Sequence, residues 1–324
     1  MLVGGLFLAG CTAPTDTTTP TDTPTDTDTT TAPTIGDMQT ITDFSAITVS
    51  GDFATQPTVT APYAFNVDKT ICETLIEGTG VDVKEKSVVE LQYTGINATT
   101  GQTFDSSFFN MQPLIGQNGY FVPGFNKCLT GAKAGSRVVM VVSGPDGYDD
   151  QGGNSDAGIN VGDTLLFVVD VVAVQYETAE GQHLADGNQW ASVTVNKDNI
   201  PSLTINKGVP APTDLQVTVL TQGTGRQVDA GDAVYLDFLW VDYATGKEID
   251  NSYTSGGGPQ ANMLADLIPG WRTALVGQPM GSRLLIIVPG DQAYPQGNAT
   301  PSVSPGATLV FVVDILFSWV PQSQ

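Results

Sequence analysis

The stretch VVELQYTGINATTG at residues 88–101 returns as AVYLDFLWVDYATG at residues 233–246, so the chain carries one pattern twice. Residues 88–93 place apolar side chains at alternate positions, which indicates a half-buried β-strand. The repeat spacing of about 145 residues is longer than the period of solenoid repeats. The sequence therefore predicts a duplicated domain, and the repeated strand is the natural starting point for aligning the two copies.

Further segments recur in the same order on both sides of the repeated strand. They are VPGF (122–125) and IPGW (268–271), GSR (135–137) and GSR (281–283), Tyr148 and Tyr294, TLLFVVD (164–170) and TLVFVVD (308–314), and the lead-ins QPTVT (56–60) and IPSLT (200–204). The predicted organisation is a first domain over residues 41–177, a polar linker over 178–186 and a second domain over 187–324.

Each repeat is expected to be mostly β-structure. Residues 137–142 and 165–172 are short runs rich in β-branched residues, as buried strands are. Residues 125–130 and 271–276 are the best helix candidates, because each is entered from Pro-Gly and left at a glycine. Strands around one short helix predict an α+β domain with an antiparallel sheet.

The charge balance excludes several kinds of partner and site. The 324-residue chain has a net charge of −22, which would repel nucleic acid and anionic headgroups. His183 is the single histidine, so a Ser-His-Asp or Cys-His catalytic site is not expected. The acidic loop over residues 146–156 lacks EF-hand spacing and is interpreted as a solvated loop. We therefore expect no nucleic-acid partner, no metal and no cofactor.

The N-terminal residues predict export. Residues 1–10 form an apolar run too short to span a bilayer, which is typical of a signal peptide. The sequence LAGC ending at Cys11 resembles the bacterial lipobox, which implies a lipid on Cys11 and an anchor in the membrane. No Lys or Arg precedes this run, so the true start is expected to lie upstream. Residues 11–40 are rich in Thr, Pro and Asp, and we expect a disordered tether there. The folded domains are then extracytoplasmic.

Two further cysteines, Cys72 and Cys128, lie in the first repeat. An exported chain with two such cysteines can form one disulfide. Two buried free thiols are the alternative, because cysteine packs as a small apolar residue. The sequence leaves both open.

The ordered motifs of each repeat resemble the FKBP family of peptidyl-prolyl isomerases. In the first repeat they are QYTG (92–95), GQTFDSS (101–107), FVPGF (121–125), GAKAGSR (131–137), Tyr148 and TLLF (164–167). The resemblance covers nearly the whole of each repeat. It implies two tandem FKBP-like domains, each a twisted antiparallel sheet around a short helix, with an apolar pocket between them. It also implies proline-containing polypeptide clients and allows macrolide FKBP ligands.

The chemistry of an X-Pro bond agrees with such a pocket. Rotation about the amide has a barrier of about 18–20 kcal/mol, and uncatalysed exchange takes tens to hundreds of seconds. No covalent nucleophile is needed. A pocket must hold the proline ring and stabilise the twisted amide, and each 1.36 kcal/mol of preferential stabilisation gives about tenfold in rate.

By the resemblance, the first repeat carries the fuller site. Its catalytic candidates are Asp105, Tyr148, Tyr93 and Phe104. Its substrate-binding candidates are Phe121, Val122, Phe125, Ile159 and Phe167, with Phe125 as the pocket floor. The second repeat departs from the pattern at Phe238 and at Ile249, which stands where the family has an aromatic residue. Its candidates are Phe238, Ile249, Asp250, Leu267, Ile268, Trp271, Tyr294, Val303 and Phe311. A weaker second pocket is expected.

The predicted function is cis/trans isomerisation of X-Pro bonds in exported proteins, with the first domain the more active. The alternative is a tethered module that binds proline peptides or acts as a chaperone without turnover. A structural surface protein that uses the fold only as a scaffold is a third, weaker reading. An intact aromatic pocket with its Asp and Tyr, as in the first repeat, favours the enzyme.

Overall fold

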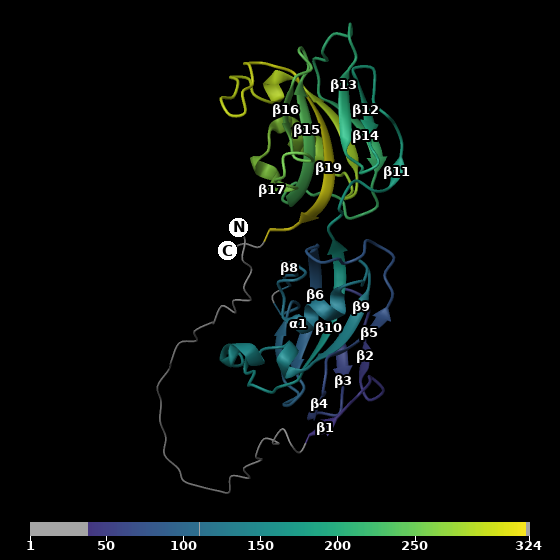
Figure 1. Cartoon of the computed structure of the whole chain (residues 1–324), viewed down its shortest axis with the longest axis vertical. Helices are drawn as coiled ribbons and strands as arrows, with labels where there is room; N and C mark the ends of the chain where they lie inside the picture. Colours follow the sequence, from purple (N-terminus) through teal and green to yellow (C-terminus); the bar gives the residue numbers. More distant parts are fainter. Residues whose placement is uncertain (1–37, 110, 322–324) are drawn as a thin grey trace. The chain divides into compact units, whose positions relative to one another are not determined.

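The computed structural model describes residues 38–109 and 111–321. They form two units that divide between Val172 and Ala173, and Figure 1 traces the chain through both. The predicted signal peptide, Cys11 and nearly all of the predicted tether lie outside the described residues. Within the described ranges, no helix is long and apolar enough to cross a membrane.

The first unit is built mainly of strands. In chain order they are β1 (Gln39–Thr40), β2 (Thr48–Ser50), β3 (Thr58–Thr60), β4 (Phe65–Asn66), β5 (Ile71–Ile76), β6 (Val88–Asn97), β7 (Thr103–Ser106), β8 (Leu114–Gln117), β9 (Arg137–Val142) and β10 (Leu165–Val174). The main sheet has the order β5-β9-β10-β6-β7, with β8 also paired to β6. The helix is α1 (Pro123–Leu129), and short 3₁₀ turns cover Gly144–Asp146, Asp149–Gln151 and Ser155–Ala157.

Both faces of this sheet are covered, which explains why β9 is buried along its whole length. Alternate residues of a strand point to opposite faces. Val139 and Val141 belong to an apolar cluster with Phe65 and the partly buried Val49 and Val59. That cluster joins the sheet to the hairpin β2–β3, which is an antiparallel pair.

The opposite face of β9 supports α1. A Cβ atom on Gly124 would lie 2.4 Å from a methyl group of Val142, so only glycine lets the helix approach this closely. The helix begins at Pro123, two residues before the predicted start, because proline fits the first helical turn. It ends one residue early, before Gly131 with φ of 90°. The predicted entry from Pro-Gly and exit at glycine are confirmed.

The second unit repeats this plan. Its strands are β11 (Gln182–His183), β12 (Ala191–Val195), β13 (Pro201–Ile205), β14 (Gln216–Gln222), β15 (Ala233–Asp242), β16 (Glu248–Asn251), β17 (Gln260–Met263), β18 (Arg283–Val288) and β19 (Leu309–Trp319). The sheet order is β11-β14-β18-β19-β15-β16, with β17 also paired to β15. The helix is α2 (Pro269–Leu275), with 3₁₀ turns at Leu264–Asp266 and Gly290–Gln292. The predicted α+β class, with mostly antiparallel sheets and a short helix in each repeat, is confirmed.

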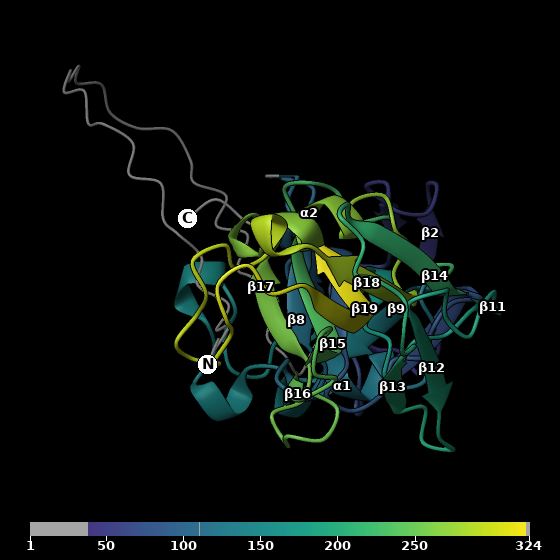
Figure 2. The ribbon, with the colours of Figure 1, turned by 90° about the horizontal axis from the view of Figure 1, so that it is seen from above.

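The second sheet is also covered on both faces. Gly270 of α2 packs on Val288. On the other face, Val193 of the hairpin β12–β13 clusters with Leu285 and Val312. Figure 2 shows α2 on one side of β18 and β19, with β12 and β13 on the other. The lead-ins that recur in the sequence are therefore strands that cover a sheet face.

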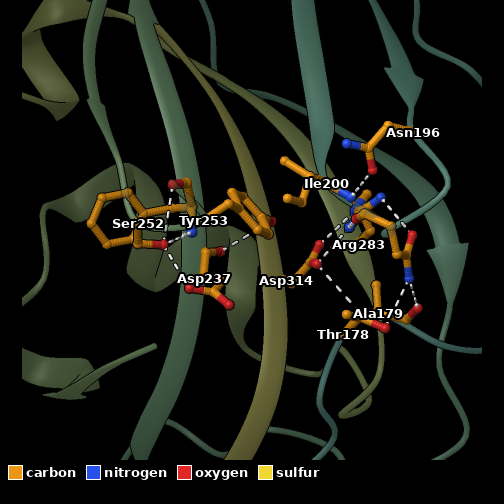
Figure 3. A network of polar contacts seen from close by, with 11 residues as sticks. Thr178, Ala179, Asn196, Ile200, Asp237, Ser252, Tyr253, Arg283 and Asp314 are labelled. Atoms are coloured by element: carbon orange, nitrogen blue, oxygen red, sulfur yellow. Dashed lines mark hydrogen bonds and ion pairs between the residues drawn. The ribbon is translucent and has the colours of Figure 1, made fainter. Parts of the chain in front are cut away.

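A buried ion pair ties each hairpin to its sheet. In the second unit, Arg283 Nε lies 2.6 Å from Asp314 Oδ1. Arg283 Nη2 donates to the backbone oxygen of Asn199 at 2.8 Å. Figure 3 shows Arg283 facing Asp314, with Asn196 and Ile200 of the hairpin turn nearby. In the first unit, Arg137 pairs with Asp170 and donates to the backbone oxygen of Gly51 at 2.6 Å. The guanidinium thus satisfies both a buried carboxylate and the carbonyls of a turn.

The predicted linker at 178–186 differs from the structure. Residues 182–183 form β11, which pairs with β14 in the second sheet, and the backbone N–H of Ala179 donates to Asp314 at 3.3 Å. The chain passes between the units before this segment. The polar composition that suggested a linker belongs to an edge strand, which is exposed on one side.

Cys72 of β5 and Cys128 of α1 form a disulfide, with Cα atoms 5.5 Å apart. Of the two alternatives that the sequence left open, the structure contains the disulfide. The bond connects the helix to the edge strand of the first sheet.

Candidate active sites

Aromatic side chains converge on α1 in the first unit. The Phe125 ring centroid lies 4.7 Å from that of Phe167 on β10, 5.9 Å from Phe121 and 6.5 Å from Tyr93 on β6. The contacts with Phe167 and Tyr93 are edge-to-face, which is a favourable arrangement for aromatic rings. Five candidates from the sequence, including Phe104 at 5.6 Å from Phe167, therefore form one cluster.

Gly95 makes room for this cluster. A Cβ atom at this position would lie 2.7 Å from the Phe104 ring and 2.8 Å from the Phe167 ring. The residue stands on β6 directly opposite Asp105 of β7. A glycine on one strand thus allows the aromatic ring of the neighbouring strand to lie over it.

Two tyrosines and a carboxylate form the polar part of this site. The Tyr93 hydroxyl donates a hydrogen bond to Asp105 Oδ2. Burial, and then the carboxylate of Asp105, raise the pKa of Tyr93. Burial first and the charge of Asp105 second also raise the pKa of Tyr148. Both phenols therefore remain protonated at neutral pH and can donate hydrogen bonds.

The remaining candidates of the first unit lie around the helix and the following loop. Val122 is half-buried and occupies the N-cap position of α1, where its side chain makes no hydrogen bond to the helix. Ile159 is buried, and its backbone pairs with Asn154 in a small bridge. This bridge fixes the loop that follows Tyr148.

The second unit contains a pocket of about 200 Å³. Seven of the predicted residues line it: Phe238, Asp250, Leu267, Ile268, Trp271, Tyr294 and Phe311. Ile249 and Val303 are not among the lining residues. Five others were missed by the sequence analysis: Trp240, Gln260, Asn262, Asp266 and Pro301.

Trp240 supplies an aromatic wall that the aliphatic Ile249 cannot provide. Its ring stacks on Phe311 with centroids 5.2 Å apart and lies 6.2 Å from Tyr294. Trp240 stands opposite Asp250, as Gly95 stands opposite Asp105. In the first unit the aromatic ring comes from β7, and in the second it comes from β15. Ile249 itself offers no aromatic ring, but Trp240 gives the second pocket an aromatic wall. The signal in the sequence was the paired change of Gly95 to Trp240 and of Phe104 to Ile249.

The polar groups of the second pocket are arranged differently. Phe238 has no hydroxyl to offer Asp250, and Asp250 Oδ1 accepts from the backbone N–H of Asn251 at 2.7 Å. Burial raises the pKa of Tyr294. The Trp271 indole N–H is buried and has no hydrogen-bond partner in the part of the chain that the structure describes. Trp271 is also one of the residues that line the pocket.

Each site combines aromatic walls with a carboxylate and a tyrosine: Asp105 and Tyr148 in the first unit, and Asp250 and Tyr294 in the second. Among the described residues, no group of three or more His, Cys, Asp or Glu side chains could hold a metal ion. The model of the FKBP-type peptidyl-prolyl cis-trans isomerase family matches residues 80–172 and again residues 224–316, together more than half of the chain. The chain therefore belongs to this family and is a peptidyl-prolyl cis-trans isomerase of the FKBP type.

Several proteins of known name are similar to parts of this chain. A probable FK506-binding protein of Corynebacterium glutamicum is 35% identical over 108 residues, covering 33% of this chain and 89% of that protein. The isomerase FkpA of Escherichia coli is 34% identical over 111 residues, covering 34% of this chain and 40% of FkpA. The outer membrane protein MIP of Legionella longbeachae is 30% identical over 148 residues, covering 44% of this chain and 58% of MIP. The crystal structure of FkpA matches with a TM-score of 0.30 and 35% identity, covering 35% of this chain and 52% of FkpA.

Proposed function

We propose that the chain isomerises X-Pro bonds of exported proteins, and that the first pocket is the more active of the two. The observation that carries this proposal is the aromatic cluster around Phe125 with the Tyr93–Asp105 pair beside it. The rings would enclose the proline side chain. The amide would then sit next to oriented polar groups with little water.

The apolar walls suit a twisted amide. When the C–N bond rotates, conjugation is lost, the nitrogen becomes more basic and the carbonyl less polar. An apolar, water-poor environment therefore favours the twisted amide over the planar substrate. Tyr148 remains protonated and would hold the substrate by donating to its carbonyl. Asp105, held by Tyr93, would lie beside the amide.

The two pockets differ in how the carboxylate is held. Tyr93 fixes Asp105, whereas Phe238 leaves Asp250 without that partner. Since Trp240 supplies the aromatic wall, this missing hydroxyl is the reason to place the second pocket below the first. The macrolide FK506, which the name of the Corynebacterium glutamicum relative mentions, would compete with proline peptides for both pockets.

We expect Tyr93→Phe, which gives the first pocket the residue found at Phe238, to lower kcat/KM of the full chain on Leu-Pro peptides by more than half. A hydrogen bond to a charged group contributes about 1.5–3 kcal/mol, so activity of the first pocket should fall about tenfold or more. Protease-coupled or NMR exchange assays measure this. Tyr63→Phe, at a half-exposed tyrosine that stacks on Phe65, is the matched control and should leave kcat/KM unchanged.

The paired variant Asp105→Ala with Asp250→Ala separates turnover from binding. Loss of isomerase activity with retained folding supports the enzyme mechanism. Unchanged activity would reject the role of the carboxylates. A folded wild-type chain that binds proline peptides without accelerating their exchange would favour the alternative, a binding or chaperone module.

The location proposed is the outer side of a cell membrane, with Cys11 carrying the lipid. The sequence LAGC at residues 8–11 supports it, and so does the Cys72–Cys128 disulfide, because disulfides persist in oxidising compartments. We expect cells that express the chain to incorporate labelled palmitate into it, and Cys11→Ser to abolish the label and release the protein from membranes. Cys72→Ser is the control, since it removes a disulfide-bonded cysteine elsewhere in the chain and should keep the label. Label retained in Cys11→Ser would reject the anchor.

A further inference from the structure

The second pocket is lined by two carboxylates and by no basic residue. Asp250 is half-buried on β16, and Asp266 is exposed at the end of the 3₁₀ turn that precedes α2. The lining also contains two side-chain amides, Gln260 and Asn262, which carry no charge. A ligand in this pocket therefore meets negative charge on two of its walls.

The first unit has a different set of residues at the corresponding places. Tyr120, which precedes Phe121, stands where Asp266 precedes Leu267. Tyr120 is exposed. At this position the second unit therefore carries a carboxylate where the first carries an aromatic side chain.

We propose that the second pocket prefers proline segments in which Lys or Arg directly flanks the proline. The proposal rests on the proposed function of the second pocket. The net charge of −22 acts on the whole chain, so a preference of this pocket must come from its own lining, Asp250 and above all the exposed Asp266. An exposed pair contributes modestly, and two carboxylates at one pocket are expected to give a preference of about threefold to tenfold.

The chain provides a readout that separates the two pockets. All four tryptophans, Trp190, Trp240, Trp271 and Trp319, lie in the second unit. Two of them, Trp240 and Trp271, line the pocket. Tryptophan fluorescence of the full chain therefore reports ligand binding at the second pocket, and the first pocket need not be disabled.

The experiment titrates the full chain with short peptides free of Trp and Tyr, in which Arg, Lys, Leu or Glu precedes or follows a single proline. We expect Arg and Lys peptides to bind about threefold to tenfold more tightly than Leu peptides, and Glu peptides to bind most weakly. The preference should shrink as salt rises from 20 mM to about 500 mM, because exposed charges are screened. Equal affinities for Arg and Leu peptides would overturn the charge preference alone.

Asp266→Asn tests the residue. The ratio of Arg to Leu affinities should fall toward one, whereas Asp214→Asn, the same change at an exposed site outside the pocket, should leave the ratio as it was. A ratio that Asp266→Asn does not move would reject the assignment of Asp266. A fluorescence signal that no proline peptide changes would instead reject ligand binding by the second pocket, and with it the proposed function of that unit.

Discussion

Replacing Arg283 with alanine is expected to lower the free energy of unfolding of the second unit by about 3–5 kcal/mol. Asp314 is fully buried, and without Arg283 its carboxylate would have no charge partner. The hairpin turn at Asn199 would also lose the guanidinium that satisfies its carbonyl. Chemical denaturation followed by tryptophan fluorescence measures the effect, because the tryptophans report on this unit.

The loss should depend on pH. Burial raises the pKa of Asp314 and Arg283 opposes that rise. In Arg283→Ala the pKa of Asp314 in the folded chain rises further above its pKa in the unfolded chain. Folding then disfavours the ionised carboxylate, so the loss of stability grows as pH increases beyond the ordinary carboxyl range. The variant should therefore be closer to wild type at pH 5 than at pH 8.

Two variants control this result. Lys197→Ala breaks an exposed ion pair with Asp198 in the same hairpin and should cost less than about 0.5 kcal/mol. Arg283→Met combined with Asp314→Leu removes both charges and should recover much of the lost stability. If Arg283→Ala were no more destabilising than Lys197→Ala, the ion pair would not hold the hairpin as described.

Trp240→Gly is expected to destabilise the second unit by about 3–5 kcal/mol and to weaken proline-peptide binding at its pocket. The change removes a buried ring that stacks on Phe311 and leaves a cavity, as large-to-small changes in a core do. Adding Ile249→Phe should restore part of both properties, because the ring would then come from the neighbouring strand, as Phe104 does beside Gly95. Denaturation and Trp271 fluorescence titration measure the two effects.

The first unit offers the reciprocal test. Gly95→Trp alone should be severely destabilising, because its Cβ would meet Phe104 at 2.7 Å. Gly95→Trp with Phe104→Ile should be better tolerated than the single change. If the losses of stability from the two single changes simply add in the double variants of both units, the two positions do not compensate for one another.

Much of the fold could be predicted because the duplication presents each strand and helix motif twice in the sequence. The Pro-Gly helix entries and the alternating strands depend on local residues, and both were found. Trp240 was missed as a wall because its role depends on Ile249 across a strand pair, which a single strand does not reveal. Residues 178–186 were interpreted as a linker because a polar edge strand has the composition of a loop.

The hairpins also bear on the extent of the repeated unit. The family match begins at residues 80 and 224, after β2–β3 and β12–β13. Yet both copies carry the hairpin, and in both an arginine paired with a buried aspartate holds its turn. The unit that repeats in this chain is therefore larger than the region the family model matches, and it includes the hairpin with its arginine.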